Sequence, residues 1–582
     1  MSGSRSPFGQ IPAGAPVIGP AERGRFRIAV FGDFSGRAVS GRTEGSDAIA
    51  TRRAAPLDVD TLDAVIESFA TTLVLPIGRD GDGVAVPLNA FDDLHPDALY
   101  ANVEMFQSLS TLRQRLATGS LADGALQDLR DWGARFDRPV TVPKRSAGTA
   151  VRADIRISDF QALIGGGRQR HASAADDLIA QVVGPYVLQR PDTGVDAMRA
   201  TVDEALGGAM RLVLHHPDFQ ALESHWRSLD FLARNIETDA AVELVVFDLS
   251  ASELAADLAA GDDLSQSGLF RLLMRACGTT GGFSAMFGLY EFEDTPPHAE
   301  LLGRLSRIAE HAGAPFITAL ANRSIDVALK DRHPLAKRSW DQLARLPSAR
   351  YLGLAAPRFM LRQPYGRNSD PITAFRFDEF SRREGLRGFL WANPALLVAV
   401  LMARSFAEDG QAMRLGRVMT LGDIPFYWVN DRYGDQVALP CTERNLAVRG
   451  LEAVAKRHIM PVLWMKGRDQ IRLGAFQSVA GAPLAGPWSP GAAWEAQKKT
   501  PAPARTPQVE VLMPVVTPLD TPDDASEPAP EPQQPDAEAP ALTPEEEDVL
   551  DTLLASFEDE DETDTGSDGD IDPELAALLE GL

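Results

Sequence analysis

The amino-acid sequence predicts an α/β fold: a mixed, mostly parallel sheet flanked by helices, preceded by a small α+β unit and followed by a disordered acidic tail. Strand-like apolar runs alternate with helix-like segments between residues 242 and 429, a pattern typical of a parallel sheet covered on both faces. A shorter series of such elements precedes it. Acidic residues are concentrated in residues 497–582, where 24 acidic and 3 basic side chains supply −21 of the net charge of −25.

Composition divides the chain of 582 residues into five parts. A domain takes about 100–200 residues, so several folding units are expected. The parts are a flexible N-terminus at 1–24, a small α+β unit at 25–137, a linker at 138–193, a large α/β domain at 194–488, and a Pro-rich acidic tail at 489–582.

The small unit is predicted to begin with a strand, on one face of which Phe26, Ile28 and Val30 lie. After Asp60, apolar residues at helical spacing predict a helix. The elements expected in this unit are a strand at 25–34, a helix at 58–73, a short strand at 83–91 and one or two helices at 95–116.

Helix-start and helix-stop signals organise the large domain. Pro217 suits the first position of a helix, Ser250 and Glu253 form a capping box, and Gly313 stands where a C-terminal cap belongs. The predicted helices are 196–214, 217–236, a helix from Ser250, 299–312, 333–346 and a buried helix at 389–406. The predicted strands are 242–249, 283–292, 315–321, 350–355 and 423–429.

The tail has thirteen prolines between residues 497 and 582 and many acidic residues, which together preclude a packed core. Two short amphipathic helices are expected in it, at 544–557 and 573–582. Both are too short to persist alone in water but suit a partner's groove. Their apolar residues are the partner-binding candidates Val549, Leu550, Leu553, Leu554, Phe557, Leu575, Leu578, Leu579 and Leu582.

Several classes of protein are disfavoured. Cys277 and Cys441 form no C-x-x-C pair, which fits a reducing cytoplasm. The N-terminus lacks the apolar core of a secretory signal, and the longest apolar run, 395–403, is far shorter than the ~20 residues of a membrane span. The nearly neutral body argues against a nucleic-acid coat, and neither body nor tail suits an anionic membrane.

A search for chemistry finds no nucleotide-binding, hydrolase or zinc-protease motif. The loop 32–37 follows a strand but lacks the lysine of a phosphate loop, so a turn is favoured over phosphate binding. His215, His216 and His225 are spaced for capping and packing rather than for a shared metal. We therefore expect no enzyme, cofactor or metal site.

Three arginines follow one another closely near the middle of the large domain. They could hold an anion, but ion pairs within the fold or between subunits are favoured. They are Arg358, Arg362 and Arg367.

The segment 214–229, LHHPDFQALESHWRSL, resembles the signature of the large subunit of the type VI secretion contractile sheath, with Ser228 in place of the usual glycine. GLYEF at 288–292, RYLGL at 350–354, PRFMLRQPYG at 357–366 and LWANP at 390–394 match the same family in order over 195–480. The signature residues are Phe219, Gln220, Leu222, Glu223, Trp226, Arg227, Leu229, Arg358, Arg362, Tyr365 and Gly366.

Residues 25–116 resemble the small sheath subunit through FGDFSGR at 31–37 and FDDLHPD at 91–97. The chain is thus similar to both subunits of a TssB/TssC-type sheath fused together. The large-subunit family normally continues through a further C-terminal region, for which 450–480 stands as an abbreviated ending.

The resemblance implies a contractile-tail-sheath-like fold and a cytoplasmic structural protein. Its implied partners are other sheath subunits, an inner-tube protein, baseplate components and an AAA+ recycling ATPase, which would grip Phe160 and Leu163. Sheath subunits also donate strands to neighbours, and 20–31 and 138–157 are candidates, with an intrachain edge strand or plain linker equally compatible.

Three functions remain open from the sequence. The chain is a structural sheath component, a non-polymerising sheath-like adaptor that recruits partners through its tail, or, least favoured, an α/β enzyme with an unrecognised site.

Overall fold

A nine-stranded sheet organises the computed structural model, which describes residues 7–78, 83–117, 122–136, 193–328, 330–367, 369–381, 385–430, 436–446 and 448–494. The strand order is β11-β15-β14-β8-β7-β6-β1-β5-β2. The six strands from β14 to β5 are parallel, and β11, β15 and β2 are antiparallel additions at the edges. The predicted fold class is confirmed.

In chain order, the strands of this sheet are β1 (Phe26–Gly32), β2 (Ala55–Leu57), β5 (Val242–Asp248), β6 (Ala285–Phe292), β7 (Phe316–Leu320), β8 (Leu352–Ala356), β11 (Thr420–Leu421), β14 (Met460–Trp464) and β15 (Ile471–Leu473). Three antiparallel pairs stand outside it: β3 (Thr71–Leu75) with β4 (Val84–Leu88), β9 (Phe359–Arg362) with β10 (Leu390–Ala392), and β12 (Trp428–Asn430) with β13 (Gln436–Ala438).

Strand β1, from the small unit, lies in the middle of the large domain's strands. It pairs with β5 from Phe26↔Val242 to Gly32↔Asp248, and with β6 from Ile28↔Ala285 to Phe31↔Gly288. All seven of its residues are buried, as expected of a parallel strand covered on both faces. Without β1, β5 and β6 would have no common neighbour, so the two sequence regions share one sheet.

The two faces of the sheet carry two hydrophobic cores, and alternate residues of β1 contribute to each. Phe26, Ile28 and Val30 belong to the core that includes α9 and α15. Ala29 and Phe31 belong to the other, which includes α10, α11 and α12. Successive side chains of a strand point to opposite faces of the sheet, so this one short strand contributes to both hydrophobic cores.

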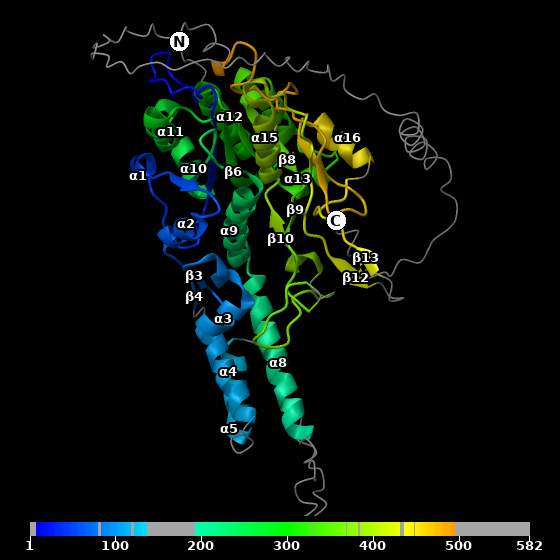
Figure 1. The fold of residues 1–582 in the computed structure, drawn as a ribbon. Helices are drawn as coiled ribbons and strands as arrows, with labels where there is room; N and C mark the ends of the chain where they lie inside the picture. Colours follow the sequence, from blue (N-terminus) through cyan, green and yellow to red (C-terminus); the bar gives the residue numbers. More distant parts are fainter. Residues whose placement is uncertain are drawn as a thin grey trace, which may run out of the picture. The chain divides into compact units, whose positions relative to one another are not determined.

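The helices of the small unit are α1 (Ser46–Thr51), α2 (Leu62–Phe69), α3 (Pro96–Asn102), α4 (Glu104–Ala117) and α5 (Ala122–Arg135). Those of the large domain are α8 (Thr193–Leu214), α9 (Pro217–Asn235), α10 (Ala251–Ala259), α11 (Gly268–Thr280), α12 (Pro296–Ala312), α13 (Asn322–Asp326), α14 (Pro334–Ala344), α15 (Ala395–Asp409) and α16 (Val448–Lys456). Helices α4 and α8 pack side by side (Figure 1).

Several predicted boundaries differ from the structure. The helix expected at 58–73 ends at Phe69, and Thr71–Leu75 forms β3, because its buried and exposed residues alternate. The helix expected at 389–406 begins at Ala395, after β10 and Pro394. The strand expected at 423–429 is β12, at Trp428–Asn430. Helices α5 and α11 and strands β14 and β15 lie where no element was predicted.

The N-terminal segment also differs from the flexible stretch predicted by its glycines and prolines. Phe8 and Ile18 are buried in the core beside α11 and α12. Gln10 forms a bridge with Asp263, and Ala21 forms one with Gly282. Two large apolar anchors and these backbone bonds hold residues 7–24 against the large domain, which composition alone does not reveal.

The linker beyond residue 136, and with it Phe160, Leu163 and the candidate strand at 138–157, lies outside the described residues, as does the tail from residue 495. The other candidate strand, 20–31, ends in β1, which is paired on both sides within the chain. Among the described residues, no helix is long and apolar enough to cross a membrane.

Candidate functional site

Helix α9 carries the sequence signature, and its start follows the predicted pattern. The ring of His216 caps the helix by accepting a hydrogen bond from Asp218 N at 3.3 Å, and Pro217 occupies the first turn. The signature residues on its apolar face are fully or almost fully buried: Phe219, Leu222, Trp226 and Leu229. The Nε1–H of Trp226 donates to Phe34 O at 2.7 Å, so the signature helix holds the loop after β1.

A buried ion network extends from the polar side of the same helix. Glu223 accepts hydrogen bonds from Arg362 Nε at 2.6 Å and from Arg227 Nε at 2.7 Å. Arg362 also donates to Glu379 at 2.7 and 3.1 Å, and Arg227 donates to the hydroxyl of Tyr365 at 2.6 Å. Of the two kinds of ion pair expected for Arg362, within the fold or between subunits, the described residues contain pairs within the fold.

The charges of this network compensate one another, since two guanidinium groups face two carboxylates whose side chains have no exposed area. Burial opposes the charge on Arg362, but the carboxylates of Glu223 and Glu379 raise its pKa well above the ordinary value. Burial likewise opposes ionisation of Glu379, yet Arg362 lowers its pKa. Burial raises the pKa of Tyr365 to about 12. The network is therefore built to stay ionised and fixed.

Gly366 follows Tyr365, and a side chain at this position would displace the carboxylate of Asp378. A Cβ at this position would lie 2.9 Å from Asp378 Oδ1. The backbone N–H of Gly366 donates to Asp370 O at 2.9 Å, which turns the chain toward Glu379.

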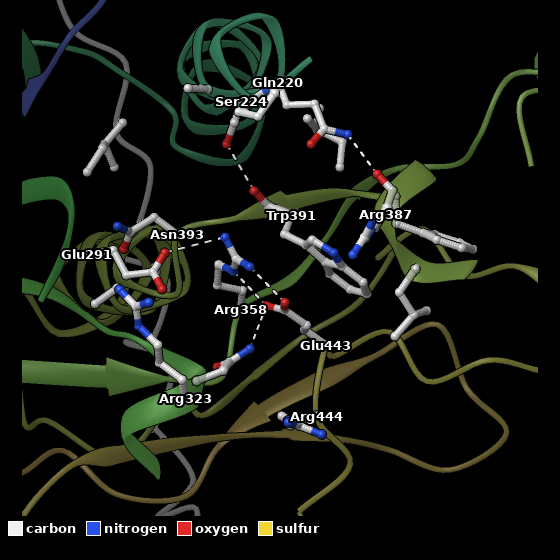
Figure 2. Close-up of a pocket in the computed structure, with 18 of the residues that line it drawn as sticks. Gln220, Ser224, Glu291, Arg323, Arg358, Arg387, Trp391, Asn393, Glu443 and Arg444 are labelled. Atoms are coloured by element: carbon white, nitrogen blue, oxygen red, sulfur yellow. Dashed lines mark hydrogen bonds and ion pairs between the residues drawn. The ribbon is translucent and has the colours of Figure 1, made fainter. Parts of the chain in front are cut away.

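A cavity of about 760 Å³ lies beside helix α9, whose residues Gln220 and Ser224 line it (Figure 2). It lies at the carboxyl ends of β6 and β7, the edge at which α/β sheets commonly bind ligands. Arg358 forms a bidentate ion pair there with Glu443, at 2.6 and 2.7 Å, and a longer one with Glu291 at 3.4 Å. Gln220 donates to Arg387 O at 2.9 Å across the opening.

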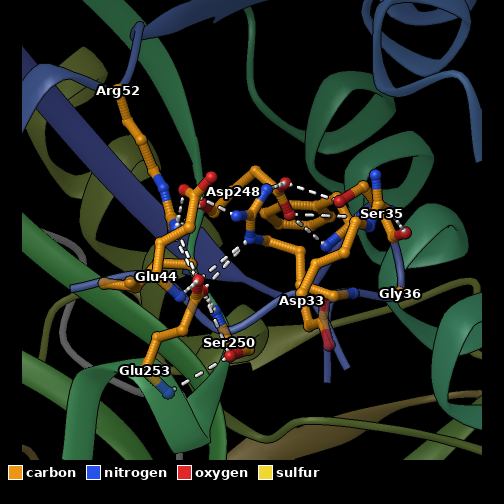
Figure 3. A network of polar contacts seen from close by, with 12 residues as sticks. Asp33, Ser35, Gly36, Glu44, Arg52, Asp248, Ser250 and Glu253 are labelled. Carbon is orange, nitrogen blue, oxygen red and sulfur yellow. Dashed lines mark hydrogen bonds and ion pairs between the residues drawn. The ribbon is translucent and has the colours of Figure 1, made fainter. Parts of the chain in front are cut away.

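A third polar cluster joins the small unit to the large domain (Figure 3). Glu253, whose side chain has no exposed area, accepts from Arg37 Nε at 3.1 Å and from both terminal nitrogens of Arg52 at 2.5 and 2.9 Å. The predicted capping box of Ser250 and Glu253 is also present. Burial opposes ionisation of Glu253, but the bonds from Arg52 and from backbone N–H groups lower its pKa to about 2.

The loop after β1 has the position of a phosphate loop, but backbone N–H groups that would bind a phosphate there already donate to carboxylates of the protein. The backbone N–H groups of Phe34 and Ser35 donate to Asp248 Oδ1 at 2.9 and 3.2 Å. Those of Arg37 and Ala38 donate to Asp33 at 2.6 and 2.9 Å. Carboxylates of the protein already satisfy these donors, which favours the structural turn that the sequence indicated.

A further contact ties α3 of the small unit to the loop after Tyr365. Asp97 accepts from the backbone N–H groups of Thr373 and Ala374 at 2.9–3.0 Å and from the hydroxyl of Thr373 at 2.8 Å. Burial opposes its ionisation, but these hydrogen bonds lower its pKa. The small unit and the large domain are thus joined by the shared sheet, by the charged cluster around Glu253 and by the hydrogen bonds of Asp97.

The histidines considered as metal ligands have separate roles. His216 is the N-cap, His215 Nε2 lies 3.4 Å from Glu379 Oε1, and the ring of His225 packs edge-on against Phe34. Burial lowers the pKa of His225. Within the part of the chain that the structure describes, no group of three or more potential ligands could hold a metal.

Sequence reasoning missed the acidic partners of the signature arginines, Glu379 and Glu443, because they lie 17 and 85 residues from them along the chain. A signal for Glu379 existed, since it stands between two aromatic residues of the sequence, Phe377 and Phe380. The tail candidates Val549 to Leu582 lie outside the described residues.

Comparison with known proteins relates both regions to secretion sheaths. Residues 196–480 match the family described as EvpB/VC_A0108, tail sheath N-terminal domain. Residues 25–124 match the family described as type VI secretion system, VipA, VC_A0107 or Hcp2. Models of two sheath families thus match separate regions of this one chain. The predicted resemblance is therefore confirmed for a small-subunit region, 25–124, and a large-subunit region, 196–480.

A curated relative supports the larger match. The type VI secretion system sheath protein TssC1 of Pseudomonas aeruginosa is 32% identical over 295 residues, which cover 47% of this chain. The chain spans 59% of the length of that relative. The signature helix, the buried ion network and the cavity all belong to the large-subunit region. Arg37, Arg52 and Asp97 belong to the small-subunit region and form hydrogen bonds with the large-subunit region.

Proposed function

We propose that this chain is a structural subunit of a type VI secretion contractile sheath, which assembles around an inner tube and contracts to drive effector delivery. The observation that carries this proposal is the placement of β1. A strand of the small-subunit region completes the sheet of the large-subunit region, between β5 and β6. One chain therefore supplies a small-subunit region and a large-subunit region in a fixed ratio of one to one.

The chemistry of the described residues suits a scaffold. Buried charged groups of the described residues bind one another, as Glu223 with Arg362 and Glu253 with Arg52 do. Such networks fix the relative positions of elements rather than present free groups to a substrate. Sheath assembly further requires interfaces that repeat without closing.

The proposed setting is cytoplasmic, and the proposed partners are other sheath subunits, an inner-tube protein, baseplate components and an AAA+ recycling ATPase that grips Phe160 and Leu163. Replacing both residues with alanine should abolish capture of that ATPase in a pull-down. Full retention of the ATPase would remove this partner from the proposal.

Negative-stain microscopy of the purified chain, alone and with the products of its neighbouring genes, tests the proposal. Tubes or rings of regular repeat are the expected result. If only single particles form under every condition, the sheath function is overturned while the fold remains as described.

One observation favours a second function, a non-polymerising sheath-like adaptor. An acidic tail of net charge −21 follows the matched region. Such an adaptor would recruit secretion components through the tail. Single particles that capture those components, and lose them when residues 497–582 are deleted, would support it over the sheath.

A further inference from the structure

The cavity beside helix α9 has the size and the position of a small-molecule site (Figure 2). Its volume of about 760 Å³ lies within the ~300–1,000 Å³ of pockets that enclose small ligands. Residues at or just after the carboxyl ends of β6, β7 and β8 line it, together with residues of α9 and β10. Ligands of α/β proteins commonly bind outside this edge of the sheet. The size and the position of the cavity therefore suit a small bound molecule.

The basic residues of the cavity are only partly neutralised within the fold. Arg358 forms its ion pair with Glu443, and Arg444 pairs with Asp326 at 2.5 Å. Arg387 also lines the cavity, is exposed, and has no ion pair with any residue that the structure describes. A guanidinium group binds a carboxylate or a phosphate through two parallel hydrogen bonds. The cavity can thus accept a negatively charged group at Arg387.

A buried hydrogen-bond acceptor in the lining has no donor. Asn322 lines the cavity and is 8% exposed. Its Nδ2 donates to Glu443 Oε2, which fixes the orientation of the amide. Its Oδ1 has no hydrogen-bond partner among the described residues. A buried acceptor without a donor is costly, and a bound N–H group would remove that cost. The matching ligand therefore carries a donor as well as a negative charge.

An indole ring supplies a flat apolar surface in the same cavity. Trp391 of β10 lines the cavity and is partly exposed. The buried ring of Phe389 stacks with it, with ring centroids 5.9 Å apart and an angle of 28° between the planes. This contact restrains the indole, and Leu386 adds further apolar surface. A planar aromatic group can stack on such a ring.

We propose that this cavity binds a small aromatic anion, a nucleoside phosphate whose base carries an amino group. Arg387 binds the phosphate, the base stacks on Trp391, and the amino group donates to Asn322 Oδ1. Free nucleoside lacks the negative charge, and inorganic phosphate lacks the ring and the amino group, so neither makes all three contacts. The binding does not depend on the proposed sheath function, because every residue of the site belongs to the large-subunit region of one chain.

Isothermal titration calorimetry of the full-length chain with adenosine 5′-monophosphate tests the site. Saturable binding of one nucleotide per chain is the expected result, and adenosine and inorganic phosphate should each bind at least roughly ten-fold more weakly. Arg387→Gln should weaken nucleotide binding about ten-fold but leave adenosine binding unchanged, because only the phosphate contacts Arg387. Trp391→Leu should weaken the binding of nucleotide and of adenosine alike, about ten-fold each, because both stack on the indole.

Arg345→Gln is the matched control, because Arg345 is also exposed but lies at the end of α14, outside the cavity. It should leave nucleotide affinity unchanged, and urea unfolding checks that each variant is folded. The absence of saturable binding at millimolar nucleotide would overturn the proposal. So would an equal loss of affinity in Arg345→Gln and Arg387→Gln, or adenosine or inorganic phosphate that binds as tightly as the nucleotide, because the three contacts would then not act together.

Discussion

At the scale of single residues, the buried network of Glu223, Arg362 and Glu379 dominates the electrostatics of the large-subunit region. Taking charges out of water is costly, and the pairing only compensates for that cost. Such a network adds little net stability over apolar residues of the same shape. Loss of one member, however, leaves the others buried without compensation.

We predict that Arg362→Met lowers the free energy of unfolding by about 3–5 kcal/mol, because the buried carboxylates of Glu223 and Glu379 lose the guanidinium group that they share, and Arg227 remains to compensate only Glu223. Urea unfolding measures the change. The matched control is Lys456→Met, which breaks an ion pair with Glu452 whose side chains are 66% and 61% exposed. That variant should change stability by less than ~1 kcal/mol. Equal effects of the two substitutions would contradict this account of the network.

Glu253 gives a pH-dependent prediction. Its pKa is about 2 in the folded protein, against an ordinary value of 4.5. A carboxyl whose folded pKa is depressed stabilises the fold fully above its unfolded pKa, and this contribution is lost as the pH falls from about 4.5 toward 2. The contribution near neutral pH is about 3 kcal/mol.

The comparison of wild type with Glu253→Gln isolates this carboxyl from the others. The wild type's advantage in unfolding free energy should be largest at pH 7 and should shrink clearly by pH 3. An advantage that is the same at both pH values would mean that Arg37 and Arg52 do not stabilise the charged form of Glu253.

At the scale of elements, β1 decides how the two regions depend on each other. Strand β1 is covalently part of the small-subunit region. It is nevertheless hydrogen-bonded to β5 and β6 of the large-subunit region, and its two faces are buried in the two hydrophobic cores of the shared sheet. We therefore expect these non-covalent contacts to hold β1 in place without the linker.

We predict that cleavage at a protease site inserted between residues 138 and 192 leaves the two fragments together. Size-exclusion chromatography without denaturant should show one peak that contains both. By contrast, residues 193–494 produced alone should be insoluble, because β5 and β6 lose their shared neighbour and expose unpaired edges and apolar faces.

Two substitutions sharpen this test. Ile28→Asp places a carboxylate on a fully buried position of β1 and should prevent the cleaved fragments from remaining together. Val74→Asp changes a residue of β3 that is 53% exposed and should have no such effect. Separation of the unmodified fragments after cleavage would show that the linker, not the sheet, holds the regions together.

At the scale of the whole molecule, net charge is divided between a body of about −4 and a tail of −21. In an assembly of many copies, the tails would repel one another and so would project into solvent rather than line a lumen. This repulsion is screened over about 10 Å at 0.1 M salt and reaches farther at lower salt.

Deleting residues 497–582 should leave the unfolding of the body unchanged but alter assembly or partner recruitment, most clearly at low salt. Urea unfolding measures the stability of the body, and sedimentation at 20 mM and 300 mM salt measures assembly. The screening length differs about four-fold between these two salt concentrations. An unfolded body after deletion would refute the division of the chain into body and tail. Identical assembly at both salt concentrations would refute the electrostatic role of the tail.

Local patterns in the sequence were sufficient for much of this fold. Pro217, Ser250 and Gly313 stand at the predicted helix boundaries, because caps and first-turn prolines act within a few residues. The alternation of strands and helices predicted a mostly parallel sheet, and the signature residues predicted the resemblance to the sheath families. All of these depend on short-range spacing.

Only the tertiary structure decided which distant segments meet. The sequence treats the small unit as separate, yet β1 lies between β5 and β6, more than 200 residues away along the chain. The partners Glu223, Arg362 and Glu379 likewise come from three segments. The physical reason is that periodicity determines which face of an element is buried, whereas strand order and charge pairing depend on how the buried faces of the whole chain fit together.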